Sequence, residues 1–127
     1  MKKVAACELF KGVVIEEDKG IMDVAKLIHK FQERRIFVLD KKKYPVGIIS
    51  LVDINDRVVA KGLDLKKTKA KTIMSYPVKL IADVGDDVVK VASKMVHFDI
   101  YYVPVISKGV FKGILTYANI LKALDKK

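Results

Sequence analysis

The sequence has little of what builds covalent, metal or redox sites. Its single cysteine, Cys7, excludes an intramolecular disulfide. With only His29 and His97 beside that thiol, the chain lacks the Cys and His clusters that bind zinc, so no metal site is expected. The motifs GxxxxGK[ST], HExxH, GxSxG and CxxC are absent as well. We therefore expect neither enzymatic activity nor a catalytic cofactor.

Long apolar runs are also missing. No stretch approaches the roughly 18 apolar residues of a membrane-spanning helix. Near the start, only three apolar residues separate Lys3 from Cys7, whereas the apolar segment of a signal peptide needs about 7 to 15. The sequence predicts a cytoplasmic protein with an unprocessed N-terminus and no membrane contact.

The composition favours a packed, basic globular protein. Hydrophobic residues make up 51% of the 127 residues and charged residues 31%, which is too apolar for a disordered chain. Lysine and arginine total 25 against 15 acids, a formal net charge of +10. The length predicts one compact domain or two half-size units that share a core.

An internal repeat organises the chain. The segment GIISLVDI at residues 47–54 returns as GILTYANI at residues 113–120, an offset of 66. Upstream, with one residue deleted in the second hairpin, Val38 aligns with Val105 and Phe31 with Phe98. The simplest explanation is two copies of one unit.

Both copies predict the same order of elements. A short β-branched or apolar run (residues 13–15; 80–81) precedes a polar turn and a helix with one apolar face. That face carries Ile21, Val24, Ala25, Ile28 and Phe31 in the first copy, and Val88, Val91, Ala92 and Met95 in the second. A strand pair follows (36–39 with 45–49; 102–106 with 110–115), and then a second helix that begins at Ser50 or Thr116.

The expected fold class is therefore α/β (α+β), built from two β-α-β-β-α repeats with helices packed on small mixed sheets. We place the first repeat at residues 1–62 and the second at residues 72–127. The lysine-rich residues 63–71 form the expected linker, with a short helical turn at residues 70–74.

The repeat resembles a tandem pair of CBS domains, the arrangement called a Bateman module. Residues 47–53 (GIISLVD) match the family's G-apolar-apolar-[ST]-x-x-D signature, and residues 113–119 (GILTYAN) match it except at the final acid. Residues 33–40 (ERRIFVLD) resemble the family's R-R-L-P-V-V-D strand with Phe37 in place of proline, whereas residues 101–105 (YYVPV) keep the proline and lose both arginines. Residues 72–78 (TIMSYPV) resemble the segment that leads into the second domain. The resemblance extends from about residue 5 to residue 125.

The resemblance implies a regulatory module whose two repeats pack with pseudo-twofold symmetry and form two clefts for AMP, ADP, ATP or a related adenosine compound. In the family, the signature Asp binds the ribose hydroxyls, the Ser or Thr contacts ribose or phosphate, and the strands enclose the adenine. Carried over, the ligand-binding residues are Val13, Arg35, Ile48, Ser50 and Asp53 in the first repeat, and Leu80, Tyr102, Pro104, Ile114, Thr116 and Asn119 in the second.

Ser50 and Asp53 have two physical interpretations. A strand that ends at residue 49 brings Ser50 to a helix N-terminus, which favours phosphate, and the Asp53 carboxylate can accept both hydroxyls of a cis-diol. The Ser-x-x-Asp spacing is equally close to a capping box, and both roles are compatible. Asn119, at the position that corresponds to Asp53, lacks the negative charge of a carboxylate. We therefore expect the second cleft to bind its ligand more weakly or more selectively.

The remaining candidates each have a plainer alternative. Arg34 and Arg35 alternate across a strand, so only one can face the cleft, and Arg35 is our choice because Arg34 precedes the strand. Tyr101 and Tyr102 could stack on a base or pack in the core. We expect His29 and His97 to be cations at helix ends, and Cys7 to behave as a small hydrophobe.

The basic charge raises a second functional hypothesis, a nucleic-acid-binding protein with or without nucleotide control. Lysines cluster at residues 41–43, 66–71 and 126–127, but the clusters are dispersed and no base-reading element accompanies them. A third hypothesis is a structural interaction module with empty clefts. The closing helix of the first repeat carries more apolar residues than one small sheet needs, which predicts a homodimer: Leu51, Val52, Ile54, Val58 and Val59. The sequence does not identify the partner protein that the module regulates.

Overall fold

The computed structural model describes residues 1–126, and its α/β chain divides into two compact units, each with one three-stranded sheet. The first-repeat unit comprises Val13–Val78. The second-repeat unit comprises Met1–Gly12 together with residues 79–126. The units therefore differ from the sequence boundaries at two segments: residues 1–12 join the second repeat, and residues 63–78 join the first.

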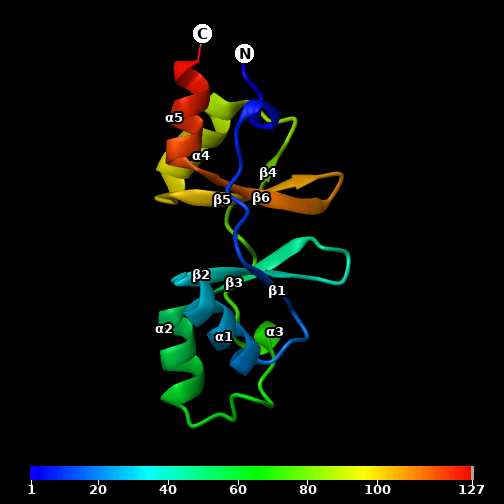
Figure 1. Ribbon diagram of the computed structural model, residues 1–127, viewed down its shortest axis with the longest axis vertical. Helices are drawn as coiled ribbons and strands as arrows, with labels where there is room; N and C mark the ends of the chain where they lie inside the picture. Colours follow the sequence, from blue (N-terminus) through cyan, green and yellow to red (C-terminus); the bar gives the residue numbers. More distant parts are fainter. Residues whose placement is uncertain (127) are drawn as a thin grey trace. The chain divides into compact units, whose positions relative to one another are not determined.

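The first-repeat unit places two helices on one face of a mixed sheet, as Figure 1 shows for α1 and α2. The sheet order is β1-β2-β3, with β1 parallel to β2 and β3 antiparallel to it. The elements are β1 (Val14–Glu16), α1 (Ile21–Phe31), β2 (Arg35–Leu39), β3 (Pro45–Ser50), α2 (Leu51–Ile54), the π-helical continuation η2 (Asn55–Val59) and α3 (Ala70–Ile73).

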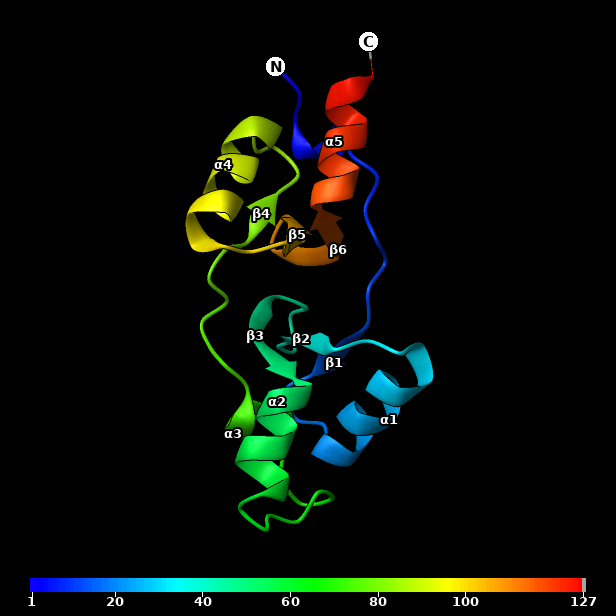
Figure 2. The ribbon, with the colours of Figure 1, turned by 90° about the vertical axis from the view of Figure 1, so that its left-hand side faces the viewer.

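The second-repeat unit repeats this arrangement, with α4 and α5 on one face of the sheet β4-β5-β6 (Figures 1 and 2). Here the residues before the first strand contribute the short helix η1. The elements are η1 (Val4–Ala6), β4 (Ala82–Asp83), α4 (Val88–Phe98), β5 (Tyr102–Ser107), β6 (Val110–Thr116) and α5 (Tyr117–Asp125).

The apolar periodicity explains both cores. Ile21, Val24 and Ile28 of α1 are buried against the strand residues Ile36 and Ile49. In the second-repeat unit, Val88, Val91 and Met95 of α4 are buried with Val103, Val105 and Leu115. Phe31 departs from the expectation: it is half exposed, because α1 ends there and Gln32 takes a left-handed conformation.

Both units protect the outer edge of the last strand in the same way. In the first-repeat unit, Ser75 exchanges two backbone hydrogen bonds with Ile48 of β3, at 2.9 and 3.0 Å. In the second, Phe10 does the same with Ile114 of β6, at 2.8 and 2.7 Å. The signature glycines permit this approach, since a Cβ on Gly47 would lie 2.4 Å from the Met74 sulfur.

Several expected boundaries are confirmed, and others shift. The second helices begin directly after Ser50 and Thr116, as predicted. The strand expected at residues 80–81 is instead Ala82–Asp83, because Ala82 and Asp83 pair with Val105 and Ile106. Within the described residues, none of the helices has the length and apolar character needed to span a membrane.

Candidate functional site

Ser50 and Asp53 form a reciprocal capping box at the start of α2. The Asp53 backbone N–H donates to the Ser50 hydroxyl oxygen at 3.1 Å, and the Ser50 N–H donates to Asp53 Oδ2 at 2.9 Å. Both residues are half buried. The capping interpretation is therefore confirmed, and it fixes the positions of the hydroxyl and carboxylate groups that the ligand hypothesis also requires.

The second oxygen of Asp53 faces a cation on the same helix. Asp53 Oδ1 lies 3.7 Å from an Arg57 guanidinium nitrogen, one turn along α2 and η2. Arg57 also donates to the Ile73 carbonyl at 2.7 Å and so connects η2 to the end of α3. A carboxylate accepts about four hydrogen bonds, so Asp53 keeps acceptor capacity beyond the cap.

Arg35 lies opposite Ser50 on the neighbouring strand. These two residues are register partners at the end of the β2–β3 ladder, and the Leu51 N–H donates to the Arg34 carbonyl at 3.0 Å. Arg35 is exposed. The sheet thus places Arg35 beside Ser50 at one strand end, where α2 begins and Asp53 follows.

Ile48 and Val13, two ligand-binding candidates of the first repeat, lie in different settings. The backbone N–H and carbonyl of Ile48 are both engaged by Ser75, so they do not offer hydrogen bonds to a base. Val13 precedes β1 and packs against the core of the first-repeat unit. Both residues are half buried, so their side chains stay partly accessible.

The second repeat retains the cap but not its charges. The Asn119 N–H donates to the Thr116 hydroxyl at 3.2 Å, and Tyr102 is the register partner of Thr116. The offset of 66 places Ala123 where the first repeat has Arg57, so the second repeat lacks both the acid and the cation of the Asp53–Arg57 pair. The two strand ends are therefore chemically distinct.

The other candidates of the second repeat belong to strands or core. Pro104 is buried in β5 opposite Ile114, whose backbone groups bond outward to Phe10, so the missing proline N–H removes no bond to Ile114. Leu80 lies before β4 and packs against the core of this unit. Tyr101 is exposed and contacts Tyr117 edge to face, with ring centroids 5.9 Å apart.

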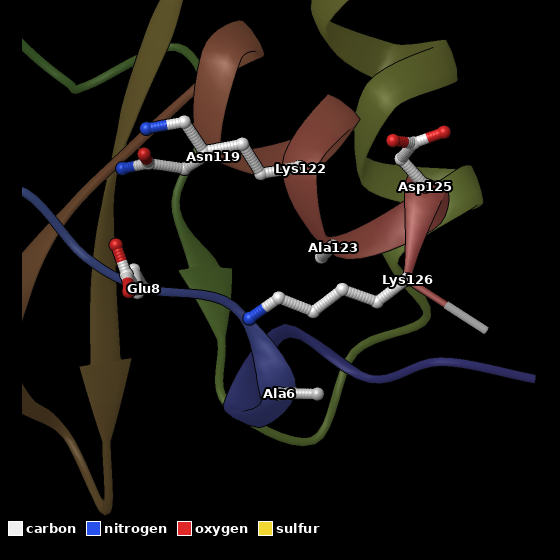
Figure 3. A pocket seen from close by; sticks show the side chains of 7 residues that line it. All are labelled: Ala6, Glu8, Asn119, Lys122, Ala123, Asp125 and Lys126. Atoms are coloured by element: carbon white, nitrogen blue, oxygen red, sulfur yellow. The ribbon is translucent and has the colours of Figure 1, made fainter.

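A hollow of about 310 Å³ opens beside α5, and sequence reasoning missed it. Its lining comes from the N-terminal segment (Ala6, Glu8), from α5 (Asn119, Lys122, Ala123, Asp125) and from Lys126, which follows α5 (Figure 3). No sequence signal pointed to Glu8, because residues 7–11 do not resemble residues 72–78. Only the folded unit brings Glu8 and Asn119 to one hollow.

The thiol and imidazole groups add no further site. Burial raises the pKa of the Cys7 thiol, and Lys2 opposes this more weakly, so the reactive thiolate is disfavoured. His29 and His97 lie exposed in the last turns of α1 and α4, as expected. Across residues 1–126, no three His, Cys, Asp or Glu side chains are grouped to bind a metal.

Known proteins share both the sequence pattern and the fold. An uncharacterized protein of Methanocaldococcus jannaschii, MJ1404, is 29% identical over 121 residues, an alignment that covers 87% of this chain. The chain spans only 29% of that relative's length.

Solved structures agree in fold. A CBS domain pair/ACT domain protein from Thermotoga maritima superposes with a TM-score of 0.76 at 19% identity, covering 97% of this chain and 96% of the other. A hexameric CBS-CP12 protein from bloom-forming cyanobacteria gives a TM-score of 0.69 at 25% identity, covering 98% and 72%.

Two segments of the chain match the same protein family. Residues 9–60 and residues 70–126 each match the CBS domain. These segments contain the two signature glycines, the two caps and the two strand ends described above. The chain therefore belongs to the CBS domain family, as a tandem pair of the kind that is generally regulatory and ligand-binding.

Proposed function

We propose that this CBS pair binds adenine nucleotides, passes the ligand state to a partner protein and catalyses no reaction itself. The observation that carries the proposal is the strand end of the first repeat, where Ser50 and Asp53 lie opposite Arg35. This set provides a hydroxyl, a diol acceptor and a cation for phosphate.

The capping box supports ligand binding by preorganisation. Because Ser50 and Asp53 hold each other through two hydrogen bonds, their side chains lose little freedom when a ligand binds. The Arg35 guanidinium favours a phosphate beside this pair. The ribose hydroxyls would use the acceptor capacity of Asp53 that the cap leaves.

The test is calorimetric titration of AMP, ADP and ATP into wild type and three variants. Asp53→Asn keeps an acceptor for the Ser50 N–H but removes the charge, whereas Asp53→Ala removes both. Loss of a charge-assisted hydrogen bond should weaken binding about tenfold or more in Asp53→Asn. Asp56→Asn is the matched control, because it removes the same charge from an exposed position on η2.

The outcomes separate the site from the cap. Absence of binding at millimolar nucleotide would remove the proposed function. Wild-type affinity in Asp53→Asn, combined with lower stability in Asp53→Ala, would leave Asp53 as a cap only. Equal weakening in Asp53→Asn and Asp56→Asn would indicate a general charge effect rather than a contact.

We further propose that the protein forms a homodimer through its closing helices. Leu51, Val52 and Val59 are exposed on α2 and η2, whereas Ile54 and Val58, which the sequence interpretation grouped with them, are buried in the core. Light scattering should give the mass of two chains, and Val52→Lys should lower it to one. Val96→Lys on α4, also strongly exposed, is the control. A monomeric wild type would contradict the proposal.

A further inference from the structure

Two lysine clusters that are separate in the sequence meet in the first-repeat unit. Residues 41–43 form the tip of the β2–β3 hairpin, and residues 66–71 run into the start of α3. The turn at residues 16–19 lies between them, because Glu17 bonds to both neighbours. Its N–H donates to the last carbonyl of β2 at 2.9 Å, and its carbonyl accepts from the Lys71 N–H at 3.0 Å. We call the lysines of these three segments the lysine patch: Lys19, Lys41, Lys42, Lys43, Lys69 and Lys71.

Acidic groups neutralise only part of the lysine patch. Lys43 Nζ lies 2.9 Å from Glu16 Oε1, and Lys71 Nζ lies 2.9 Å from Asp18 Oδ1. The hydrogen bond from Lys71 lowers the pKa of Asp18 most, and the charges of one lysine from the hairpin and one next to α3 lower it further. All six lysines are exposed. Among residues 1–126, the ion pairs leave the other four without a carboxylate partner: Lys19, Lys41, Lys42 and Lys69.

The second repeat shows that the fold does not require these lysines. Its turn at residues 83–86 (DVGD) and its hairpin tip at residues 107–109 (SKG) hold one lysine between them, beside two acids. Equivalent backbone bridges nevertheless join the same segments in both units: Gly20 with Lys69, and Asp87 with Lys3. The lysine patch therefore belongs to the first repeat alone, and folding does not account for it.

Carboxylates within the lysine patch favour a polypeptide over a nucleic acid as its ligand. Glu16, Glu17 and Asp18 lie on the turn between the two lysine clusters, and two of these carboxylates are ion-paired and so remain charged. Every unit of a nucleic-acid strand is anionic, so the strand would meet repulsion there. A polypeptide can place its acidic side chains over the lysines and its neutral residues over the carboxylates. Tyr44, 38% exposed next to the hairpin tip, adds a residue type that is enriched in protein interfaces.

We propose that the lysine patch is a docking surface for an acidic segment of another protein. The ammonium groups of Lys19, Lys41 and Lys69 pair with carboxylates of that segment, while Lys43 and Lys71 stay with their own acids. Because the three pairing lysines come from three segments of the chain, the folded unit sets their spacing. The surface needs no bound nucleotide, so this inference is independent of the proposed nucleotide function.

The test is fluorescence anisotropy of a labelled peptide in which Glu alternates with Ser, with a Gln–Ser peptide as the neutral probe. Wild type should bind the Glu peptide saturably and the neutral peptide not at all. A triple variant of the lysine patch should weaken binding about tenfold: Lys19→Gln, Lys41→Gln and Lys69→Gln. The matched control removes the same charge from exposed positions of the second-repeat unit and should change binding less than about twofold: Lys90→Gln, Lys94→Gln and Lys112→Gln.

A variant with the opposite expectation gives an independent readout. Asp18→Asn removes a carboxylate from the lysine patch and releases Lys71, so it should strengthen binding of the Glu peptide about two- to threefold. Asp125→Asn, the same change at an exposed position of α5, should leave binding unchanged. A gain of affinity cannot come from a damaged fold.

Three results with the peptide would overturn the proposal: absence of saturable binding, equal weakening by the two triple variants, and an affinity in Asp18→Asn no higher than that of wild type. Single-stranded DNA of equal charge, or vesicles of phosphatidylserine, would overturn it too if they bound more tightly than the Glu peptide, because the patch would then prefer a polyphosphate or a membrane. Failure of the nucleotide titrations would leave the peptide result unchanged.

Discussion

At the scale of single residues, one hydroxyl serves both stability and the proposed site. Ser50 caps α2 through the Asp53 N–H, and Thr116 caps α5 in the same way. Replacing a capping Ser or Thr with Ala costs about 1 kcal/mol of folding free energy. We expect Ser50→Ala and Thr116→Ala each to lower the free energy of unfolding by that amount in urea titrations. Unchanged stability in both variants would contradict the capping geometry.

Gly47 provides a second prediction at this scale. A Cβ there would lie 2.4 Å from Met74 Sδ and 3.0 Å from the Ser75 carbonyl oxygen, so Gly47→Ala must displace the segment that bonds to Ile48. We expect a loss of about 1 to 3 kcal/mol, as for other overpacked sites. Gly85→Ala, in an exposed turn, should cost less. Met74→Ala should restore only part of the loss, since the backbone contact persists.

The sequence grouped the residues of the first strand end, but it did not indicate the hollow beside α5. Ser50, Asp53 and Arg35 are close in a motif or on adjacent strands, so periodicity and the repeat were sufficient to group them. Glu8 and Lys122 are 114 residues apart in the chain. Their common hollow depends on how residues 1–12 fold back onto the second repeat, which no local pattern encodes.

At the scale of elements, two exposed ion pairs connect the end of β1 and the turn after it to other segments of the first-repeat unit. Asp18, in the turn after β1, pairs with Lys71 of α3 at 2.9 Å, and Glu16 of β1 pairs with Lys43 of the β2–β3 hairpin at 2.9 Å. Hydrogen bonds from these lysines, reinforced by their charge, lower the pKa of both carboxyls, and Asp18 raises the pKa of Lys71.

The sign of the pH dependence follows from these directions. Lowered carboxyl pKa values stabilise the fold above the unfolded values, near 4, and this stabilisation is lost as the pH falls through the folded values. The raised pKa of Lys71 stabilises the fold at pH values below the pKa that Lys71 has in the unfolded chain. This stabilisation is lost as the pH rises through the higher pKa of the folded state. The urea concentration at the unfolding midpoint should decrease as the pH is lowered from about 5 to about 3. The decrease should be smaller in Asp18→Asn, which has lost one of the two carboxyls.

The effect should be small, because the pairs are exposed and salt screens them. Lys71→Gln is the control: at neutral pH it should match Asp18→Asn, and the double variant should add little to either. An additive double variant would show that the two side chains do not interact in solution.

The N-terminal segment precedes the first repeat in the chain but packs in the second-repeat unit, and this can be tested. Val4 of η1 is buried in the core of the second-repeat unit, whereas Ile73 of α3 is buried in that of the first. Val4→Ala should therefore lower hydrogen-exchange protection in residues 79–126, and Ile73→Ala in Val13–Val78, because each opens a cavity in one core. Loss of protection in the opposite unit would contradict this division of the chain.

Most elements were predictable because each repeats a strong periodic pattern. The two hairpins and the starts of α2 and α5 follow from alternation and from a capping residue. The displaced strand β4 shows the limit: Leu80 and Ile81 are more apolar, but pairing with Val105 and Ile106 selects Ala82–Asp83. Pairing between distant segments, rather than local apolarity, decided that position.

At the scale of the whole molecule, the positive charge is divided evenly. Val13–Val78 has 14 basic and 9 acidic residues, and the remaining sequence has 11 and 6, so each unit carries +5. Such a spread favours general attraction of anions over a dedicated nucleic-acid face. We expect labelled duplex DNA to show no saturable binding in fluorescence anisotropy at about 150 mM salt.

The nucleic-acid hypothesis predicts a different result. Tight binding at low salt, with a steep logarithmic loss as salt rises, would mean that several phosphates are neutralised at once. In that case AMP should be added to the complex, because competition would connect the two activities.

The strand edges occupied by Ser75 and Phe10 have a consequence for how the protein fails. An uncovered edge is a template on which another chain can add a strand, the usual first step toward aggregates. In this chain, Ser75 closes that template on β3 and Phe10 closes it on β6, each from within the same unit. Proteolytic cleavage or mutation near residue 10 or residue 75 should therefore promote precipitation well before either core melts.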